Sequence, residues 1–426
     1  MSWADAADPA AAYARMLLAR HGIAADVRPA ERPRTPAADW AESGAMALTG
    51  SAEGPPRLVE GAPATTVRGA LLALGGLARV AGLDASSLPD ARVLSERAAY
   101  MGLAPRGAVS AGGATRLLDA ADGQLAITLS RDDDVAALPA LTGRDAGGED
   151  PWATLADWVA GTSTADVVER AGLLGLAAGS VDATVPAVSE PATPTLVSPA
   201  PLAAPPLIVD LSALWAGPLC GHLLGLLGAQ VVTVESTHRP DPTRHVAPEF
   251  HRLLRGTRQP IRLDLEAADG LARLKELVSR ADVVIESTRP RALHQLGVYP
   301  AEVVAAAKGC TWVSITGYGR AHNRVGYGDD VAAAAGLLGT AAGYPGPVFA
   351  GDAIADPLTG THAAVAALAG VLVGQSAVVD VAMYDVARAA RTPLPDAAVV
   401  RRNDTWYVDD GRELVAVRAP AVRPAA

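Results

Sequence analysis

The sequence contains very few cysteines and lysines. Cys220 and Cys310 are the two cysteines among 426 residues, too few for a disulfide framework or a thiolate metal site. We therefore expect no metal centre and a reducing compartment, the cytoplasm. Lys275 and Lys308 are the two lysines, which leaves 34 arginines among the 36 basic residues. Phosphate recognition, if present, must depend mostly on arginine side chains or helix N-termini.

Long apolar runs and an excess of positive charge are also absent. No run of 18 uninterrupted apolar residues occurs, and residues 1–9 carry acidic rather than basic side chains. We therefore expect neither a membrane span nor an export signal. The net charge of −10 argues against nucleic acid as the main partner. With half of its residues apolar, the chain is long enough for two or three domains with a sizeable core.

The second half of the sequence alternates short apolar runs with helical patterns. Residues 207–211 form such a run, and Gly217 and Pro218 then open an amphipathic helix that ends at Gly228. Further strands are expected at 230–235, 282–286 and 311–316, and further helices at 267–280, 300–308, near 330–340 and at 357–374. This alternation predicts an α/β fold: an open, mostly parallel, Rossmann-like sheet with helices on both faces.

A proline-rich segment, 181–206, precedes this pattern and is typical of an extended linker. It divides the chain into residues 1–180 and 207–426. The first part predicts a smaller α+β domain. Its expected elements are helices at 66–80, 151–161 and 164–174, a glycine-rich loop at 110–114, and a turn and strand at 122–130.

An internal repeat relates the two parts. Residues 43–74 and 335–368 both contain a small-residue helix, a glycine turn, a proline-containing turn, a short apolar run, a glycine and an alanine-rich helix. Alanine-rich helices align easily by chance, so the spacing of proline and glycine supports the interpretation of a common origin. The second copy has Asp356 where the first has Thr65 or Thr66.

Several motifs together resemble the class III CoA transferases, the formyl-CoA and carnitine CoA transferase type. In order, they are VDLSALWAGPLCGHLLGLLGAQVVTVE, RLLRGTRQPIRLDLE, LVSRADVVIESTRPRALHQLG, WVSITGYG, GDD and FAGDAIADPLTGTH. The resemblance covers roughly residues 205–390, and the first part resembles a truncated piece of the same family. The domain order departs from that of the family, which suggests a fusion of two trimmed copies or a permutation. The resemblance implies a homodimer or an intramolecular pseudo-dimer.

The resemblance implies an enzyme that moves CoA between carboxylic acids, with an acyl-CoA thioester as substrate and no permanently bound cofactor. Asp356 matches the family's nucleophile, a carboxylate that forms a mixed anhydride and then an aspartyl-CoA thioester. The residue lies at the start of an alanine-rich helix, where local amides would favour its charge. The alternative for Asp356 is a plain helix N-cap.

The CoA-binding residues implied by the resemblance each have a structural alternative. Ala216, Gly217 and Pro218 match a CoA-lining helix start, or are an ordinary helix start. Tyr318 matches a tyrosine near the thioester, or is a core residue. Gly112 and Gly113 match a loop that shields the intermediate from water, or form a simple turn. The available phosphate partners, each of which could instead be a solvated surface charge, are Arg239, Arg244, Arg255, Arg258, Arg289 and Arg291.

Some family positions are not kept. Ser236, Thr257 and Thr316 stand where relatives carry basic residues, and residues 287–291 replace Asn-Phe-Arg-Pro-Gly. Fewer donors weaken the expected binding of CoA. A non-catalytic CoA-binding or partner protein of the same ancestry, and a nucleotide-binding protein that shares only the fold, are therefore alternatives. Racemases of the superfamily use a Gly-His-Asp motif that reads Gly-Asp-Asp here, and His222 and His362 are interpreted as structural histidines.

Overall fold

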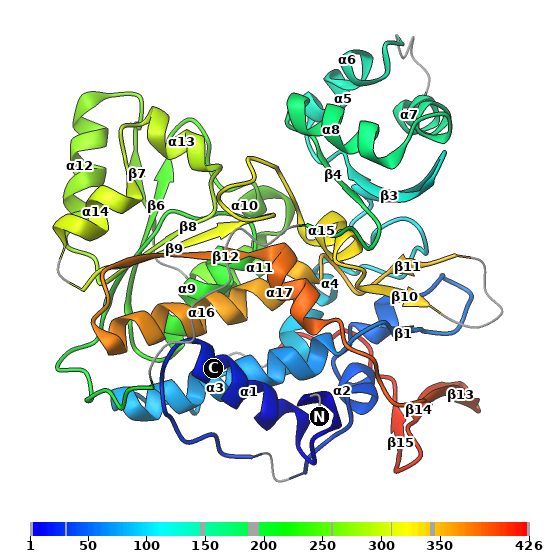
Figure 1. Cartoon of the computed structure of the whole chain (residues 1–426), viewed down its shortest axis with the longest axis horizontal. Coiled ribbons are helices and arrows are strands. Elements are labelled where there is room, and N and C mark those ends of the chain that lie inside the picture. The colour runs from blue at the N-terminus through cyan, green and yellow to red at the C-terminus, as the bar shows by residue number, and fades with distance from the viewer. Residues whose placement is uncertain are drawn as a thin grey trace.

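The computed structural model describes residues 3–29, 32–144, 150–185, 196–256, 259–307, 309–340 and 346–423. Its central feature is an open sheet of six parallel strands in the order β7-β6-β5-β8-β9-β12 (Figure 1). The strands are β5 (Leu207–Asp210), β6 (Gln230–Ser236), β7 (Ile261–Leu263), β8 (Val283–Glu286), β9 (Thr311–Thr316) and β12 (Ala377–Ala382). Numbered along the chain, this order is 3-2-1-4-5-6, the order of a doubly wound sheet. The predicted parallel α/β architecture is confirmed.

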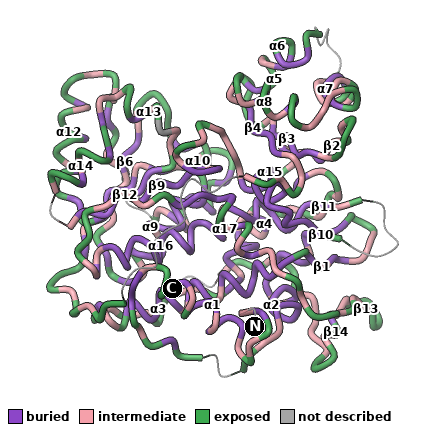
Figure 2. Tube along the Cα trace, in the orientation of Figure 1, coloured by how far each residue is buried: buried purple, intermediate pink, exposed green. Residues whose placement is uncertain are grey.

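Helices cover both faces of the sheet because successive strand residues point to opposite sides. Ile208 and Val283 point into one core cluster, whereas their neighbours Val209 and Val284 point into another. The first face carries α9 (Ala216–Leu226) and α16 (Ala355–Val373), and the second carries α12 (Ala268–Ser279), α13 (Pro290–Gln295) and α14 (Pro300–Ala306). Figure 2 shows the buried trace running through the sheet and α16.

The N-terminal segment adds a further helical layer over α16. Its elements are α1 (Pro9–Arg20), α2 (Pro36–Glu42), α3 (Pro63–Ala81), α4 (Glu96–Met101) and short 3-10 helices at Trp3–Asp5, Met46–Leu48 and Ala91–Leu94. Helix α3 packs against both α1 and α16. One core cluster therefore contains side chains from both sides of the predicted linker, for example Leu74 and Val365.

In the described residues, the predicted small α+β unit is a three-stranded antiparallel sheet with four helices. Its elements are β2 (Thr115–Ala120), β3 (Gly123–Thr128), β4 (Ala177–Ser180), α5 (Asp132–Ala136), α6 (Leu138–Thr142), α7 (Pro151–Ala160) and α8 (Thr164–Leu174). It has its own core, in which Ile127 packs with Leu155 and Val167. Figure 1 shows the unit standing away from the large sheet, with α15 (Gly328–Ala334) packed against β3 and β4 at the junction.

The two repeat segments meet in space. Helices α3 and α16 contain 19 residues each, and both end at a glycine in the left-handed conformation, Gly82 and Gly374. Strand β1 (Leu58–Val59) pairs with β10 (Leu338–Thr340), which in turn pairs with β11 (Val348–Phe349). The two segments thus share one small sheet and one helix pair, and their common origin stays a prediction.

Three features differ from the sequence-based expectations. The helix expected near 330–340 is wrong in its second half, because α15 ends at Ala334 and Gly336, with φ of 76°, turns the chain into β10. The segment 181–206, where described, contains one bridge between Val197 and Ile23. The C-terminal elements were not expected: α17 (Met383–Ala390) and the antiparallel sheet of β13 (Ala398–Arg402), β14 (Thr405–Asp409) and β15 (Leu414–Ala416).

Helix α16 has the length and apolar composition of a membrane span. In this structure it is a core helix, because 78% of its most apolar 18-residue stretch is buried inside the protein. It packs against α3, α9 and α17. Burial inside the protein therefore accounts for its composition.

Candidate active site

A pocket of about 220 Å³ lies at the carboxyl ends of the parallel strands. The residues that follow successive strands line it: Ala213 and Leu214 after β5, Ser287 and Thr288 after β8, Gly317 after β9, and Met383 after β12. Open parallel sheets bind ligands at this edge, where the strand order reverses beside the first strand. The pocket therefore occupies the position expected of a ligand site in this fold.

Asp356 lines this pocket. The N-cap of α16 is Ile354, so Asp356 is already inside the helix and is not the plain N-cap of the alternative interpretation. Its carboxylate accepts hydrogen bonds from the backbone N–H groups of Ala216 and Gly328, which begin α9 and α15. Burial raises the pKa of Asp356 to about 6, and these two donors and Arg97 oppose the rise.

Gly328 packs directly against the candidate nucleophile. A Cβ atom at this position would lie 2.3 Å from Asp356 Oδ2 and 2.3 Å from the carbonyl oxygen of Ala353. Such approaches are far shorter than van der Waals contact, so only glycine fits without a shift of the first turn of α16. The sequence order Gly-Asp-Asp after the Tyr318 loop therefore has a local packing reason.

A second cavity, of about 520 Å³, continues the pocket toward α8. The two cavities share Arg289, His322 and Arg324. Burial and the nearby charges of Arg131 and Arg291 lower the pKa of Arg289, which indicates a site with accumulated positive charge. Arginines in such a cluster are suited to phosphate or carboxylate groups. Arg289 and Arg291 were expected from the sequence, whereas Arg131 and Arg324 were not.

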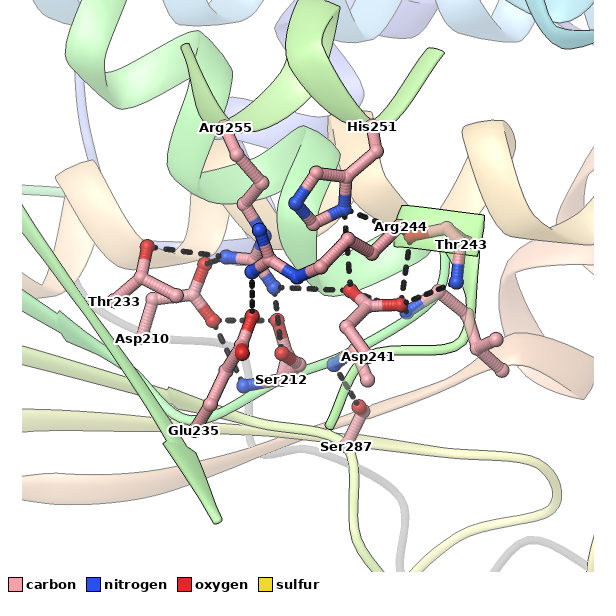
Figure 3. Close-up of polar contacts among 12 residues, drawn as sticks. Asp210, Ser212, Thr233, Glu235, Asp241, Thr243, Arg244, His251, Arg255 and Ser287 are labelled. Atoms are coloured by element: carbon pink, nitrogen blue, oxygen red, sulfur yellow. Dashed lines mark hydrogen bonds and ion pairs between the residues drawn. The ribbon is translucent and has the colours of Figure 1, made fainter. Parts of the chain in front are cut away.

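The other predicted arginines lie elsewhere. Arg239 is exposed and lines neither the Asp356 pocket nor the second cavity. Arg244 Nη2 donates to Glu235 Oε1 at 2.6 Å. Arg255 pairs with Asp210 and donates to the carbonyl of Ser212 (Figure 3). Arg258 lies outside the described residues.

The network of Figure 3 supports the loop between β5 and α9. Asp241 accepts the backbone N–H of Leu214, whose φ is 70°, and Arg255 Nη2 donates to Ser212 O at 2.6 Å. The loop leads directly into Ala216, whose N–H reaches Asp356. Arg244 and Arg255 thus belong to a buried structural network. The alternative for these arginines, a solvated surface charge, did not predict this network.

The glycine and proline predictions divide between two cavities. Ala216 lines the Asp356 pocket, whereas Pro218 lines a separate cavity between α9 and α11 (Pro248–Arg255). A Cβ on Gly217 would lie 2.1 Å from Ser212 Oγ, so close packing requires glycine there. A Cβ on Gly112 would lie 3.5 Å from Arg97 Nη2. The 110–114 loop therefore lies beside the acidic cluster that is described below. Gly113 turns this loop with φ of 84°.

Tyr318 and His362 are buried, whereas His222 is half-buried and lines the cavity between α9 and α11. Tyr318 is 3% exposed, the Arg324 guanidinium lies 3.8 Å above its ring, and burial raises its pKa. His362 Nε2 bonds with Tyr13 Oη at 2.8 Å, and burial lowers the pKa of His362 to about 4. Burial likewise lowers the pKa of His222 to about 4. The structural interpretation of both histidines agrees with these surroundings.

Sequence reasoning missed an acidic cluster behind Asp356. Asp329 and Asp352 are buried beside it, and Arg97 from α4 pairs with Asp352 through Nε–Oδ2 and Nη2–Oδ1 distances of 2.8 and 2.5 Å. Burial and the charge of Asp352 raise the pKa of Asp329 to about 7. Asp329 was visible in the Gly-Asp-Asp motif, but no motif pointed to Arg97.

Comparison with known proteins finds a family match for the second half of the chain. Residues 207–402 match the model of CoA-transferase family III. This segment holds the six-stranded sheet, α16 and the residues that line the Asp356 pocket, apart from Arg131. The segment is thus related to CoA transferases.

The similar curated proteins carry more specific names. The chain is 31% identical to the succinyl-CoA–D-citramalate CoA-transferase of Chloroflexus aurantiacus, over 42% of this chain and 48% of that protein. It is 31% identical to the succinate–glutarate CoA-transferase of Agrobacterium fabrum, over 49% of this chain and 56% of that protein. The chain thus spans about half the length of the curated relatives it matches.

Solved structures match over a similar extent. The crystal structure of a hypothetical protein from Mycobacterium tuberculosis is 28% identical and covers 47% of this chain and 63% of its own, with a TM-score of 0.41. A CAIB/BAIF family protein from Brucella suis is 24% identical, with a TM-score of 0.41.

Proposed function

We propose that this protein is a CoA transferase in which Asp356 is the nucleophile. In the proposed reaction, a carboxylate oxygen of Asp356 attacks the thioester carbon of an acyl-CoA, and the C–S bond breaks to give a mixed anhydride and CoA thiolate. The thiolate then attacks the aspartyl carbon and releases the donor carboxylate. The acceptor carboxylate enters by the reverse sequence, so Asp356 is regenerated and no proton is consumed.

The position of Asp356 is the observation that carries this proposal. The side chain lines the pocket at the carboxyl ends of the strands, and two backbone N–H groups from other helices hold its carboxylate. With a pKa of about 6, it would be about nine-tenths ionised at pH 7, and more basic than an ordinary aspartate. The same N–H groups would stabilise negative charge on the oxygen during acyl transfer.

The arginine-lined cavity provides a place for the phosphate groups of CoA. Arg289 and Arg324 line both the Asp356 pocket and the second cavity, and Arg291 lines the second. In the proposed pose, the pantetheine arm lies in the pocket with its sulfur near Asp356, and the phosphates contact the arginines. Charge-assisted hydrogen bonds to arginine provide the contacts that the missing lysines would otherwise make.

Short dicarboxylic acids are the proposed acyl groups. The relatives above are named for succinate, glutarate and citramalate, which each carry a second carboxylate. An arginine of the cluster near Asp356 could pair with that second carboxylate. We therefore propose succinyl-CoA as the first donor to test, with succinate and glutarate as acceptors.

We further propose that the two halves of the chain form an intramolecular pseudo-dimer that arose by duplication. Support comes from the shared small sheet and the packed helix pair α3 and α16. Residues from before the linker, Arg97 and Gly112, lie beside the acidic cluster of the second half. A solution mass equal to one chain, in a preparation that retains CoA transfer, would support this arrangement, and activity confined to a dimer would contradict it.

Covalent capture tests the function. The protein is mixed with succinyl-CoA, treated with borohydride or hydroxylamine, digested and examined by mass spectrometry for a modification at Asp356. Modification that is lost in Asp356→Asn and kept in Asp269→Asn, an exposed aspartate on α12, is the expected result. CoA binding without modification would instead favour a non-catalytic CoA-binding protein, and absence of CoA binding would favour a likeness of fold alone.

A further inference from the structure

Three carboxylates and one guanidinium group share the space behind the pocket. Besides burial, the charges of Asp352 and Asp356 raise the pKa of Asp329, the charge of Asp352 raises the pKa of Asp356, and Arg97 opposes both rises. Asp329 and Asp352 are 7% and 0% exposed. Buried charges of one sign are costly unless a counter-charge is close. The proposed reaction uses Asp356 and leaves the roles of the other three side chains open.

Arg97 contacts the approaches to two of the helices that place Asp356, α16 and α9. Its guanidinium pairs in a two-pronged manner with Asp352, in the turn that leads into α16. It also lies 5.0 Å from the ring centroid of Trp215, the residue before Ala216. Arg97 therefore bridges the start of the helix that carries Asp356 and the start of the helix that donates an N–H to it. Its own helix, α4, comes from the part of the chain before the linker.

Asp329 completes the support from the other side. Its Oδ1 accepts the backbone N–H of Ala353 at 2.9 Å. Ala353 has φ of 43°, and its carbonyl accepts the N–H of Asp356 at 2.9 Å. The turn before α16 is thus fixed by Asp329 at one point and by Arg97 through Asp352 at the next.

We propose that Arg97 is a positioning residue which, acting through Asp352 and Trp215, holds Asp356 in the pocket and keeps its carboxylate available for attack. The attack by Asp356 rests on the proposed function. The contacts of Arg97 with Asp352 and Trp215 do not depend on it. Through Arg97, the first half of the chain would contribute a residue to the Asp356 site of the second half. The charge of Arg97 also opposes the rise in the pKa of Asp356, an effect that a paired arginine far from the site would not have.

Removal of the guanidinium charge should raise the pKa of Asp356 further above 6, because the charge of Arg97 opposes the rise and that of Asp352 promotes it. Removal of the Asp352 charge should lower that pKa. The other charged or titratable groups that face Asp356 across the pocket stay in place in both variants; they are Arg131, Arg289, His322, Arg324 and Tyr327.

The test is an NMR titration of isotopically labelled aspartate carboxyl carbons, with the Asp356 signal assigned by its loss in Asp356→Asn. Arg97→Gln should move the titration midpoint of Asp356 upward by about one pH unit or more, a tenfold change in proton affinity. Asp352→Asn should move it downward. Arg68→Gln is the matched control, because Arg68, on α3 of the other repeat copy, pairs with the buried Asp39 of α2. It should leave the midpoint unchanged.

An unchanged midpoint in Arg97→Gln would overturn the inference. If Arg97→Gln does not fold, the direction of the shift in Asp352→Asn decides, and an upward or absent shift overturns it. Covalent capture distinguishes this inference from the proposed function. Absence of capture in the wild type refutes the function while the titration still decides on Arg97. In Arg97→Gln, capture should fall at neutral pH and recover at higher pH, whereas an equal loss at every pH would indicate a purely structural arginine.

Discussion

Substitution of Gly328 by alanine should separate Asp356 from its backbone donors without removing the carboxylate. The added Cβ would lie 2.3 Å from Asp356 Oδ2, 2.3 Å from Ala353 O and 2.6 Å from Ala353 C. The side-chain oxygen could rotate away, but the carbonyl of Ala353 accepts the N–H of Asp356 and cannot move alone. The first turn of α16 or the start of α15 must therefore shift by about 1 Å, because ordinary van der Waals contact begins at 3.4 Å.

The expected effect has two parts. Overpacking in a filled interior costs about 1–3 kcal/mol of unfolding free energy, measurable by urea denaturation. A displacement near 1 Å at a reacting group can reduce its rate by about a hundredfold, so capture of an acyl group at Asp356 should slow by about that factor.

Gly75→Ala is the control for this prediction. Gly75 lies in α3, and its nearest neighbour beyond the helix backbone would be 3.7 Å from the new Cβ. Because alanine is favoured over glycine in a helix interior by about 0.5–1 kcal/mol, this variant should be slightly more stable and capture acyl groups normally. A folded Gly328→Ala protein that captures acyl groups at the wild-type rate would refute the account of the Asp356 site.

Two further predictions concern charge. Because the native pKa of Asp329 is raised from 3.8 to about 7, the native state binds more protons than the unfolded state between these values, and this group reduces stability as pH rises. The free energy of unfolding of Asp329→Asn, measured with urea, should therefore exceed that of wild type by about 2–4 kcal/mol at about pH 8 and by little at about pH 4. An equal difference at both pH values would contradict this. Arg289→Gln should weaken CoA binding about tenfold in calorimetry, because one charged contact contributes about 1.4 kcal/mol. Arg273→Gln, at an exposed position of α12, should leave the affinity unchanged. Equal affinities in the two variants would rule out Arg289 as a phosphate partner.

The α/β half was predictable because its strands are short apolar runs between clear helix signals. The strand expected at 311–316 is β9, and the helix expected at 357–374 is α16 within two residues at each end. The pattern failed where backbone geometry overrides composition. Gly336 ends α15 and lets Leu338–Thr340 pair with β1, a partner that lies far away in the sequence. An alanine-rich pattern does not contain that information.

The candidate site was predictable in part. Asp356 and Arg289 follow from the motifs that they occupy, and both line the pocket. Arg97 could not be found, because its six-residue helix carries no motif and its partner Asp352 is contributed by the other half of the chain. Such a contact depends on how α3 and α16 pack, which is a tertiary property.

Transfer of heavy oxygen from an acceptor carboxylate to Asp356 tests the central claim most directly. The protein is incubated with succinyl-CoA and succinate labelled with heavy oxygen in both carboxylates, and the peptide that contains Asp356 is then weighed and fragmented. When thiolate attacks the acceptor carbon of the second anhydride, the bridging oxygen stays on Asp356. The account predicts that label at Asp356 rises over the first few turnovers toward both carboxylate oxygens, and that none enters protein incubated without succinyl-CoA. Turnover that leaves Asp356 unlabelled would contradict it.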